Sequence, residues 1–412
     1  MQSHPSTKDR IPFPSLILFF TRDPPARELC TPDTVGAGNE GKVMGMSVAG
    51  EDANLTANAE AFAGRLFEAG LGSFDLLSVY IGDRLGLYAM LAEMEPVTLS
   101  EFADKAGIHS RYAKEWLEQQ AVTGILDVDD TSKGEDDRRF SLPRAHAEAL
   151  INLDSPFSVT PLARQVVSAA QALPRLLEVY RTGGGVPWSA YGPDMIESQG
   201  DFNRPWLVSQ FGNEFLPSLP DIHGRLVADP PARVADVACG VGWASIAIAK
   251  AYPKAHVDGF DPDESSIEVA RRLAREAGVG DRVRFEVRDA ASMSDQGPYD
   301  LALVIESIHD MSRPVEVLDA IRRSLAPDAP LLVADERVAD AFTVPGDEIE
   351  RFMYAASMMI CLPNGLAGQP SAGTGTVMRA GTLRDYAMQA GFRDMETLPF
   401  EPGFLRFYRL KT

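Results

Sequence analysis

The chain has 412 residues, which is more than one small domain usually contains, so its length predicts at least two domains. Hydrophobic residues make up 45% and charged residues 24% of the sequence, as in ordinary globular proteins that do not span a membrane. The net charge of −20 at pH 7 repels phosphate groups, which argues against nucleic acids and anionic membranes as partners.

The first 54 residues are predicted to be a poorly ordered tail. Their apolar stretch, residues 11–20, is about half as long as a membrane span and contains two prolines. The residues after it lack the small-x-small pattern of a signal-peptide cleavage site. We therefore expect neither a membrane span nor a leader here.

Residues 55–155 have the pattern of a winged-helix domain, because helices precede a two-stranded wing. The predicted helices are 61–71, 76–90, 97–108 and 110–124, and the predicted strands are 125–128 and 139–142. A winged helix raises the possibility of DNA binding. The would-be recognition helix, however, contains two acidic residues, Glu115 and Glu118, beside the two basic residues Arg111 and Lys114. The wing tip at 129–137 is acidic, so this face lacks the positive charge that DNA binding requires. Dimerisation or enclosure of a substrate fits this domain better.

Residues 156–225 are predicted to form a helical connector rich in aromatic side chains. These are Trp188, Tyr191, Phe202, Trp206, Phe211 and Phe215. Most of them are expected to pack as core between domains, and some could form a wall over a ligand, since pockets favour domain junctions.

Residues 226–412 alternate strand and helix, which predicts an α/β domain with a doubly wound, Rossmann-like sheet. The predicted strands are 233–238, 256–260, 283–288, 301–306 and 331–334, with helices at 262–277 and 314–325. A hairpin of residues 392–400 and 404–410 ends the chain. Its last strand is expected to run antiparallel, at or near the edge of the sheet.

A glycine turn between the first strand and the next helix is the main candidate for a ligand site. Gly240 and Gly242 form a Gly-x-Gly turn in front of a helix N-terminus, and Asp261 ends the second strand 21 residues after Gly240. A dinucleotide fingerprint would require Gly where Ser245 stands. Asp236, four residues before Gly240, would repel a pyrophosphate and attract a cation. The pattern favours a cationic nucleoside over NAD, although an NAD-dependent oxidoreductase remains a rival interpretation.

These segments resemble the successive motifs of class I S-adenosylmethionine (SAM)-dependent methyltransferases. The motifs are residues 236–242 (DVACGVG), 259–262 (GFDP), 288–290 (RDA) and 299–306 (YDLALVIE). The resemblance implies a seven-stranded sheet with a reversed last strand. With the winged helix and connector, the chain also resembles plant-type small-molecule O-methyltransferases and bacterial relatives, in which the winged helix forms a homodimer.

The resemblance implies a role for each matching residue. Gly240 and Gly242 would line the methionine and ribose portion, and Asp236 would help to hold the methionine end. Asp261 would accept the ribose hydroxyls and Pro262 would lie against adenine. Asp289 would accept from the adenine amino group beside the Ala290 amide, although a strand-end cap is an alternative role for Asp289. Glu306 ends the fourth motif and belongs to the same predicted site.

His309 is the candidate general base, because it follows the fourth strand at the ligand-bearing edge of the sheet. The resemblance implies that Asp335, which ends the fifth strand, orients it; Asp310 or Glu336 could take that place. A lone His in a loop is often a structural hydrogen-bonding group, and methyl transfer can also proceed by alignment alone.

The segment 352–362, rich in Met and Phe, is expected to contact an apolar or aromatic acceptor. Three scattered cysteines without a Cys-x-x-Cys pair predict no metal cage and favour the cytoplasm. The leading hypothesis is a SAM-dependent methyltransferase of small molecules. The alternative is a winged-helix transcriptional regulator with a nucleoside-sensing domain.

Overall fold

The structure is a computed structural model that describes residues 43–412, so residues 1–42 of the predicted tail lie outside the described residues. The described chain divides into two compact units, 43–143 and Arg144–Thr412. A search of its helices finds none with the length and apolar character that a membrane span requires.

The first unit is the predicted winged helix. Its elements are α1 (Val43–Arg84), α2 (Leu87–Ala92), α3 (Leu99–Ala106), α4 (Ser110–Val122), β1 (Asp127–Val128) and β2 (Phe140–Ser141). Thr98 and Glu101 form a capping box that begins α3, and β1 pairs with β2 antiparallel to form the wing. In the core of the unit, the buried Trp116 stacks on Phe102 with ring centroids 5.7 Å apart.

The two helices predicted over 61–71 and 76–90 are not separate, and this expectation was wrong. Helix α1 is continuous through residues 71–76, and the break comes at Gly86, whose φ is +67°. A glycine inside a helix costs only about 1 kcal/mol relative to alanine, so Gly70 and Gly72 do not end α1. Gly86 adopts the left-handed conformation that a turn between helices requires.

The second unit begins with a helical connector. Its elements are α5 (Arg144–Leu150), α6 (Thr160–Thr182), η2 (Trp188–Tyr191), α7 (Pro193–Trp206), the π-helical η3 (Leu207–Phe215), η4 (Leu216–Ser218) and α8 (Pro220–Val227). Phe211 and Phe215 are buried; Phe211 stacks on Phe407 of the last strand, and Phe215 packs against the same ring at a tilted angle. These rings therefore belong to the core of the second unit, and they attach the connector to the sheet.

The seven-stranded sheet confirms the predicted Rossmann-like fold. Its strands are β3 (Arg233–Val237), β4 (His256–Asp261), β5 (Val283–Val287), β6 (Leu301–Ile305), β7 (Leu331–Glu336), β8 (Asp394–Thr397) and β9 (Leu405–Lys411). Their order is β5-β4-β3-β6-β7-β9-β8, and β9 runs antiparallel to both of its neighbours. The reversed last strand thus lies one position inside the edge.

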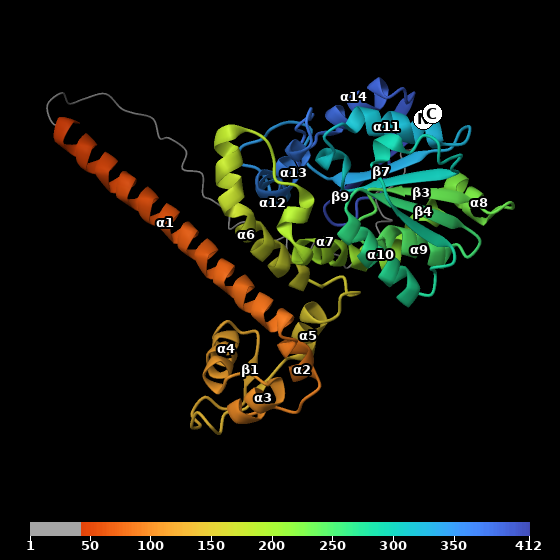
Figure 1. The fold of residues 1–412 in the computed structure, drawn as a ribbon. Helices are drawn as coiled ribbons and strands as arrows, with labels where there is room; N and C mark the ends of the chain where they lie inside the picture. Colours follow the sequence, from red (N-terminus) through yellow and green to blue (C-terminus); the bar gives the residue numbers. More distant parts are fainter. Residues whose placement is uncertain (1–42) are drawn as a thin grey trace, which may run out of the picture. The chain divides into compact units, whose positions relative to one another are not determined.

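Helices cover both faces of the sheet (Figure 1). Helices α9 (Trp243–Ala251) and α10 (Glu264–Glu276) pack on one face, and α11 (Pro314–Ser324) and α14 (Ala380–Gln389) pack on the other. The remaining elements are η5 (Ala290–Ser292), η6 (Ile308–Asp310), α12 (Glu348–Ala356), the π-helical η7 (Ser357–Cys361) and α13 (Leu362–Ala367). Strands buried on both faces explain the nearly continuous apolar runs in β3 and β6.

The parallel order places the predicted site residues at one edge. Strands β3 to β7 are parallel, so the loops that follow their carboxyl ends meet on the same side of the sheet. The glycine turn follows β3, Asp261 ends β4, and His309 follows β6. Ligands of open α/β sheets bind at this edge.

Candidate active site

A cavity of about 850 Å³ lies at the carboxyl edge of the sheet in the second unit. It is lined by every predicted cofactor-binding residue and by His309; these are Asp236, Gly240, Gly242, Asp261, Pro262, Asp289, Ala290, Glu306 and His309. Residues that follow β3, β4 and β5 form its glycine-turn half. Residues that follow or end β6 and β7, namely Glu306, His309, Asp310 and Glu336, line its acidic half, and the buried Asp335 contacts His309 without lining the cavity.

The glycine turn needs both of its glycines for different reasons. Gly240 and Gly242 have φ values of +51° and +84°, which side chains rarely adopt. A Cβ at Gly242 would also lie 2.5 Å from Cζ of Phe285, whereas one at Gly240 would meet no atom within 4 Å. Gly242 is therefore required because the backbone at the start of α9 packs directly against Phe285. Gly240 instead leaves the backbone of the turn open to a ligand.

Asp236 and Ser245 form a buried pair that explains the departure from the dinucleotide pattern. Oδ2 of Asp236 accepts hydrogen bonds from the backbone N–H of Ser245 at 3.1 Å and from its hydroxyl at 2.6 Å. Burial raises the pKa of Asp236 to about 6, against the opposing effect of these two bonds. The serine at the third glycine position therefore holds a carboxylate in the cavity wall.

Asp261 supports the turn from the neighbouring strand. Its Oδ2 accepts from the Gly240 N–H at 2.9 Å, and its Oδ1 accepts from the Asp263 N–H at 2.9 Å. Burial raises the pKa of Asp261 to about 6, although both hydrogen bonds lower it. Each carboxylate oxygen has two acceptor positions, so Asp261 retains one on each oxygen for ligand hydroxyls.

Asp289 lies at the rim of the cavity and has a structural role. Its Oδ1 accepts from the Ala291 N–H at 2.9 Å and caps η5, and its Oδ2 pairs with Nη2 of Arg313 at 3.0 Å. This is the strand-end cap that the sequence left open as the alternative. Adenine recognition by Asp289, by Ala290, which is buried, and by Pro262, which is exposed, stays a prediction.

Glu306 is held by two amides that the sequence analysis did not identify. Gln199 donates to Oε2 of Glu306 at 3.2 Å, and Asn203 donates to the same atom. Burial raises the pKa of Glu306 to about 7, although the Asn203 amide lowers it. Gln199 and Asn203 are four residues apart in α7, hence on one helix face, which is the signal that could have revealed them.

Two strand ends next to each other have unusual backbone conformations. Ala238, directly after β3, has a φ of +54°, and Glu306, directly after β6, has a φ of +50°. Neither residue is glycine, so each conformation costs free energy of order 1–3 kcal/mol, and such residues cluster at functional sites. Because β3 and β6 are neighbours, both strained residues face the same part of the cavity edge.

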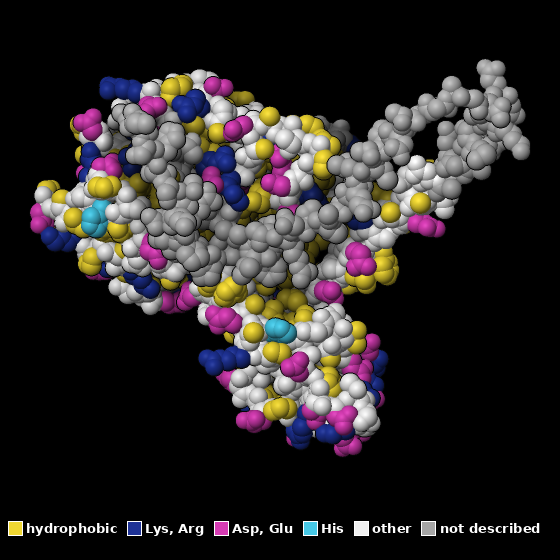
Figure 2. Space-filling model, turned by 180° about the vertical axis from the view of Figure 1, so that it is seen from behind, with side chains coloured by type: hydrophobic (Ala, Val, Ile, Leu, Met, Phe, Trp, Pro, Cys, Tyr) yellow, Lys and Arg dark blue, Asp and Glu magenta, His cyan; other side chains and the backbone are white. Residues whose placement is uncertain are grey.

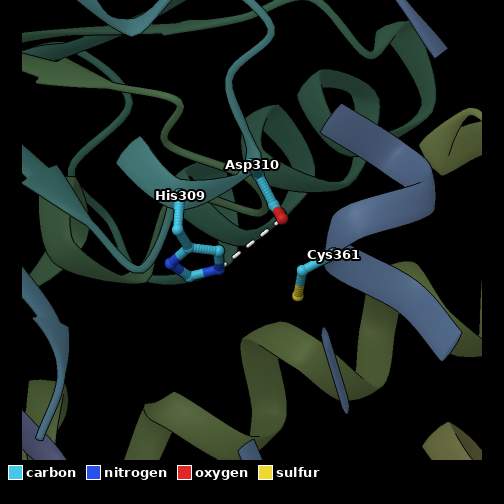
Figure 3. Close-up of side chains that lie close together, drawn as sticks. All are labelled: His309, Asp310 and Cys361. Atoms are coloured by element: carbon cyan, nitrogen blue, oxygen red, sulfur yellow. Dashed lines mark ion pairs between the residues drawn. The ribbon is translucent and has the colours of Figure 1, made fainter. Parts of the chain in front are cut away.

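His309 is surrounded by three carboxyl groups in the acidic half. Its Nδ1 lies 2.8 Å from Oδ1 of Asp335 and 3.0 Å from Oε2 of Glu336, and its Nε2 lies 3.5 Å from Oδ1 of Asp310. Figure 3 shows Cys361 of η7 opposite His309 and Asp310. Asp335 thus contacts the imidazole as predicted, and Glu336 and Asp310, the possible substitutes, contact it as well.

The electrostatics of this group depend on one imidazole. Burial lowers the pKa of His309, but the carboxylates of Asp335, Glu336 and Asp310 outweigh burial and raise the pKa well above 6.5. Burial acts to raise the pKa of Asp335, and the charge of His309 acts to lower it. The net result is a pKa of Asp335 below its ordinary value. Burial raises the pKa of Glu336 well above 4.5 and also raises that of Asp310, although His309 opposes both shifts. His309 and Asp335 are therefore the pair that carries opposite charges.

The wall opposite the acidic half is apolar, as the sequence of residues 352–362 predicts. Phe352 and Met353 of α12 line the cavity together with Met359 and Ile360 of η7. The hydroxyl of Tyr191 donates to the Met359 carbonyl at 2.7 Å and fixes this segment. Single π-helical turns inside helices are frequent at functional sites. Trp188 and Phe202 of the connector also line the cavity, so part of the aromatic set does form a wall.

Comparisons with known families identify both parts of the chain. A family described as a methyltransferase domain matches residues 228–365, and an Rv2258c-like winged HTH domain matches residues 74–152. Trans-aconitate 2-methyltransferase from Methylobacterium nodulans is 32% identical over 131 residues, which are 31% of this chain and 48% of that protein. Norajmaline N-methyltransferase from Rauvolfia serpentina is 29% identical over 104 residues, 25% of this chain and 35% of that protein. The chain thus spans about half, or less, of the length of these curated relatives.

Solved structures resemble the chain over most of its length. The mitomycin 7-O-methyltransferase MmcR has a TM-score of 0.60 at 20% identity, covering 86% of this chain and 99% of that one. Human N-acetylserotonin methyltransferase in complex with SAM has a TM-score of 0.62 at 14% identity, covering 85% and 97%. Identities this low show the fold alone. The two family matches and the shared fold together show a part similar to a winged HTH domain, residues 74–152, joined to a part similar to a methyltransferase domain, residues 228–365.

Proposed function

We propose that this chain is a SAM-dependent methyltransferase that acts on a small, apolar or aromatic molecule, with oxygen as the acceptor atom. The observation that carries the proposal is the single cavity that joins the glycine turn, Asp261 and Glu306 to the His309–Asp335 pair. Sequence relatives are named as methyltransferases, and the solved structures include one with SAM and one with SAH.

The glycine-turn half has the chemistry that SAM requires. When bound, SAM would supply a methyl group on a positively charged sulfur. Asp236, together with Glu306 of the adjoining acidic half, places carboxyl groups in the wall, which suits a cation and disfavours a diphosphate. Asp261 keeps acceptor capacity for two hydroxyls, and the amides at the N-terminus of α9 face the same turn. An NAD-dependent activity is disfavoured by the same carboxyl groups.

His309 is proposed to remove the proton of the acceptor hydroxyl, with Asp335 as its positioning residue. The hydrogen bond between Nδ1 and Asp335 fixes the imidazole orientation and leaves Nε2 for the acceptor. Because the surrounding carboxylates raise the pKa of His309, the base must first lose a proton, and we expect activity to increase with pH. Alignment in a water-excluding cavity can contribute about 7–11 kcal/mol independently of the base.

The winged-helix unit is proposed to form a homodimer and is not favoured as a DNA reader. Lys114 of the would-be recognition helix pairs with Glu135 of the wing at 2.5 Å, and Arg111 pairs with Glu115. On the face shown in Figure 2, Lys and Arg side chains lie among Asp and Glu side chains. Phosphate contacts require basic side chains that are not already neutralised. The regulator hypothesis therefore remains the secondary one.

Two measurements test the proposed function. Calorimetry with SAM, S-adenosylhomocysteine (SAH) and NAD is expected to detect binding of the first two only. Mass spectrometry of cell extracts incubated with the enzyme and isotopically labelled SAM is expected to reveal a labelled small molecule. Binding of NAD instead of SAM would reject the proposal, and a gel-shift assay at low salt would detect any DNA binding by the winged helix.

A further inference from the structure

The two α7 amides that hold Glu306 are themselves held by donors from outside. Gln199 and Asn203 both donate to Oε2 of Glu306. The carbonyl of Asn203 accepts from the indole N–H of Trp206 at 3.2 Å. The carbonyl of Gln199 accepts from the side-chain amide of Gln165 on α6 at 2.9 Å. All of these hydrogen bonds therefore point in one direction, toward the carboxyl group of Glu306.

This direction follows from the chemistry of the indole. An indole nitrogen donates and does not accept, so the Asn203 atom that contacts Trp206 must be the carbonyl oxygen. The amino group of Asn203 then points the other way, toward Glu306. A carboxyl oxygen that receives two N–H donors does not carry a proton. Oε2 of Glu306 is thus held as an acceptor.

Trp206 is anchored by packing and lies outside the lining of the cavity. Its ring packs edge-on against Phe211 and Phe407, with ring centroids 5.6 Å and 5.8 Å apart. Gln165 is buried and comes from a different helix, which packs against α7. The orientation of both amides is therefore built into the fold and does not depend on a ligand.

The other carboxyl oxygen of Glu306 remains for a ligand. Oε1 receives no hydrogen bond from the residues that the structure describes. Glu306 is only partly buried, and it lines the cavity. Oε1 therefore offers its acceptor positions to the cavity, whereas Oε2 is occupied by the amides.

The charged groups near Glu306 do not replace the amides. Burial raises the pKa of Glu306 to about 7, although the Asn203 amide lowers it. Of the titratable neighbours, His309 lowers this pKa, and Asp335 and Asp310 raise it. Other charged side chains nearby already have partners, namely Asp236 with Ser245, Arg164 with Asp201, and Arg204 with Asp154. Among the described residues, the two amides are the donors to the carboxyl group.

We propose that Trp206 and Gln165 are positioning residues of the cofactor site. They hold the α7 amides against Oε2 of Glu306, which keeps the carboxyl group ionised and presents Oε1 to the positive charge of the cofactor. This inference rests on the proposed function, because SAM is the cation that the site would receive.

Calorimetry with SAM and SAH between about pH 6 and 8.5 tests the inference, since only SAM carries the sulfonium charge. Trp206→Phe keeps an aromatic ring and removes the N–H donor. The Asn203 amide can then turn its carbonyl toward Glu306, which favours the protonated carboxyl and raises its pKa. The charged form then appears only at higher pH. We expect SAM to bind about three- to tenfold more weakly at pH 7 and SAH to change less than about twofold, with the difference largely lost by about pH 8.5.

Further variants show whether the effect passes through Glu306. Gln165→Leu removes the donor to Gln199 and should act in the same direction as Trp206→Phe. In a Glu306→Gln background, Trp206→Phe should leave the ratio of SAM to SAH affinity unchanged, because the charge is already absent. The control is Asn152→Leu, which removes an exposed amide bond to Glu148, at 3.1 Å, and should leave both affinities unchanged at every pH.

The outcomes separate this inference from the proposed function. Failure of SAH to bind the unmodified protein would reject the proposed function. If SAH binds, equal losses for SAM and SAH at every pH, or unchanged affinities in a variant whose thermal unfolding is normal, would overturn the inference alone. An effect of Trp206→Phe on the affinity ratio that persists in the Glu306→Gln background would overturn it as well. Should Trp206→Phe fail to fold, Gln165→Leu provides the same comparison from the other helix.

Discussion

The two halves of the cavity solve the problem of buried charge in opposite ways. In the glycine-turn half, Asp236 and Asp261 accept hydrogen bonds from the backbone and from Ser245 within a few residues of the turn. In the acidic half, Asp310, Asp335 and Glu336 compete for one imidazole. The first half is complete without a ligand, and the second is not.

This difference indicates which half determines what the protein recognises. A self-contained turn can be kept in many proteins of one fold, because its hydrogen bonds do not depend on the acceptor. An unsatisfied cluster is tolerated only when a ligand or a reaction makes use of it, since buried unpaired carboxylates are destabilising. We therefore expect substitutions in the glycine-turn half to change cofactor binding, and substitutions in the acidic half to change turnover and its pH dependence.

The largest expected effect is that of His309→Ala on turnover. Loss of a general base typically reduces the rate 10²- to 10⁴-fold, while SAH affinity measured by calorimetry should change by less than about threefold. His256→Ala, at an exposed position in β4, is the matched control and should leave both turnover and SAH affinity unchanged. Full activity of the His309 variant would mean that the acidic half only positions the acceptor.

Asp261→Ala tests the glycine-turn half. We expect it to weaken SAH binding on the order of 100-fold, because hydrogen bonds to a charged group contribute about 1.5–3 kcal/mol each. Turnover at saturating SAM should change much less than affinity. Thermal unfolding must be recorded alongside, since Asp261 also holds the Gly240 N–H. If the folded variant binds SAH normally, the ribose assignment is wrong.

The pH dependence of turnover tests the electrostatics of His309. The carboxylates raise its pKa well above 6.5, so the unprotonated base forms only as the pH rises through that value. Turnover should therefore increase with pH along a limb that lies well above pH 6.5. Asp335→Asn removes one of the raising charges and should move the limb to lower pH. A limb that stays in place would show that another group controls it.

The smallest expected effect is on the pH dependence of cofactor affinity. Burial raises the pKa of Asp236 and of Asp261 to about 6 and that of Glu306 to about 7, so a bound cation favours their ionised forms and proton release. SAM affinity should rise several-fold between about pH 5.5 and 8, and the rise should be smaller for SAH, which lacks the sulfonium charge. Identical pH profiles for the two ligands would contradict this.

Much of the glycine-turn half was predictable because its signals are local. A strand, a Gly-x-Gly turn and an acidic residue at the next strand end are short-range patterns, and parallel pairing brings them together. The same reasoning placed His309 at this edge, the family resemblance paired it with Asp335, and the structure joins the two at 2.8 Å. The reversed β9 was also predictable, since a Glu-Pro-Gly turn demands a hairpin.

The remaining features depend on long-range packing that no local pattern records. Gln199 and Asn203 reach Glu306 because α7 packs closely on the glycine turn, and a Cβ at Gly200 would overlap Val241. The left-handed conformations of Ala238 and Glu306 are imposed by their surroundings and have no signature in those residue types. The continuity of α1 escaped prediction because apolar spacing marked two separate stretches, 61–71 and 76–90, although the helix continues through the residues between them.

The antiparallel strand β9 has a consequence for how the protein matures on the ribosome. It inserts between β7 and β8, with Arg406 opposite Asp335 and Leu405 opposite Glu336. Until residues 405–411 have been synthesised, the outer edge of β7 has no partner, whereas β3 to β6 can already pair. Parallel and non-local pairings form slowly, and an open strand edge invites aggregation. The strand that carries Asp335 and Glu336 is therefore paired on both sides only when β9 is in place.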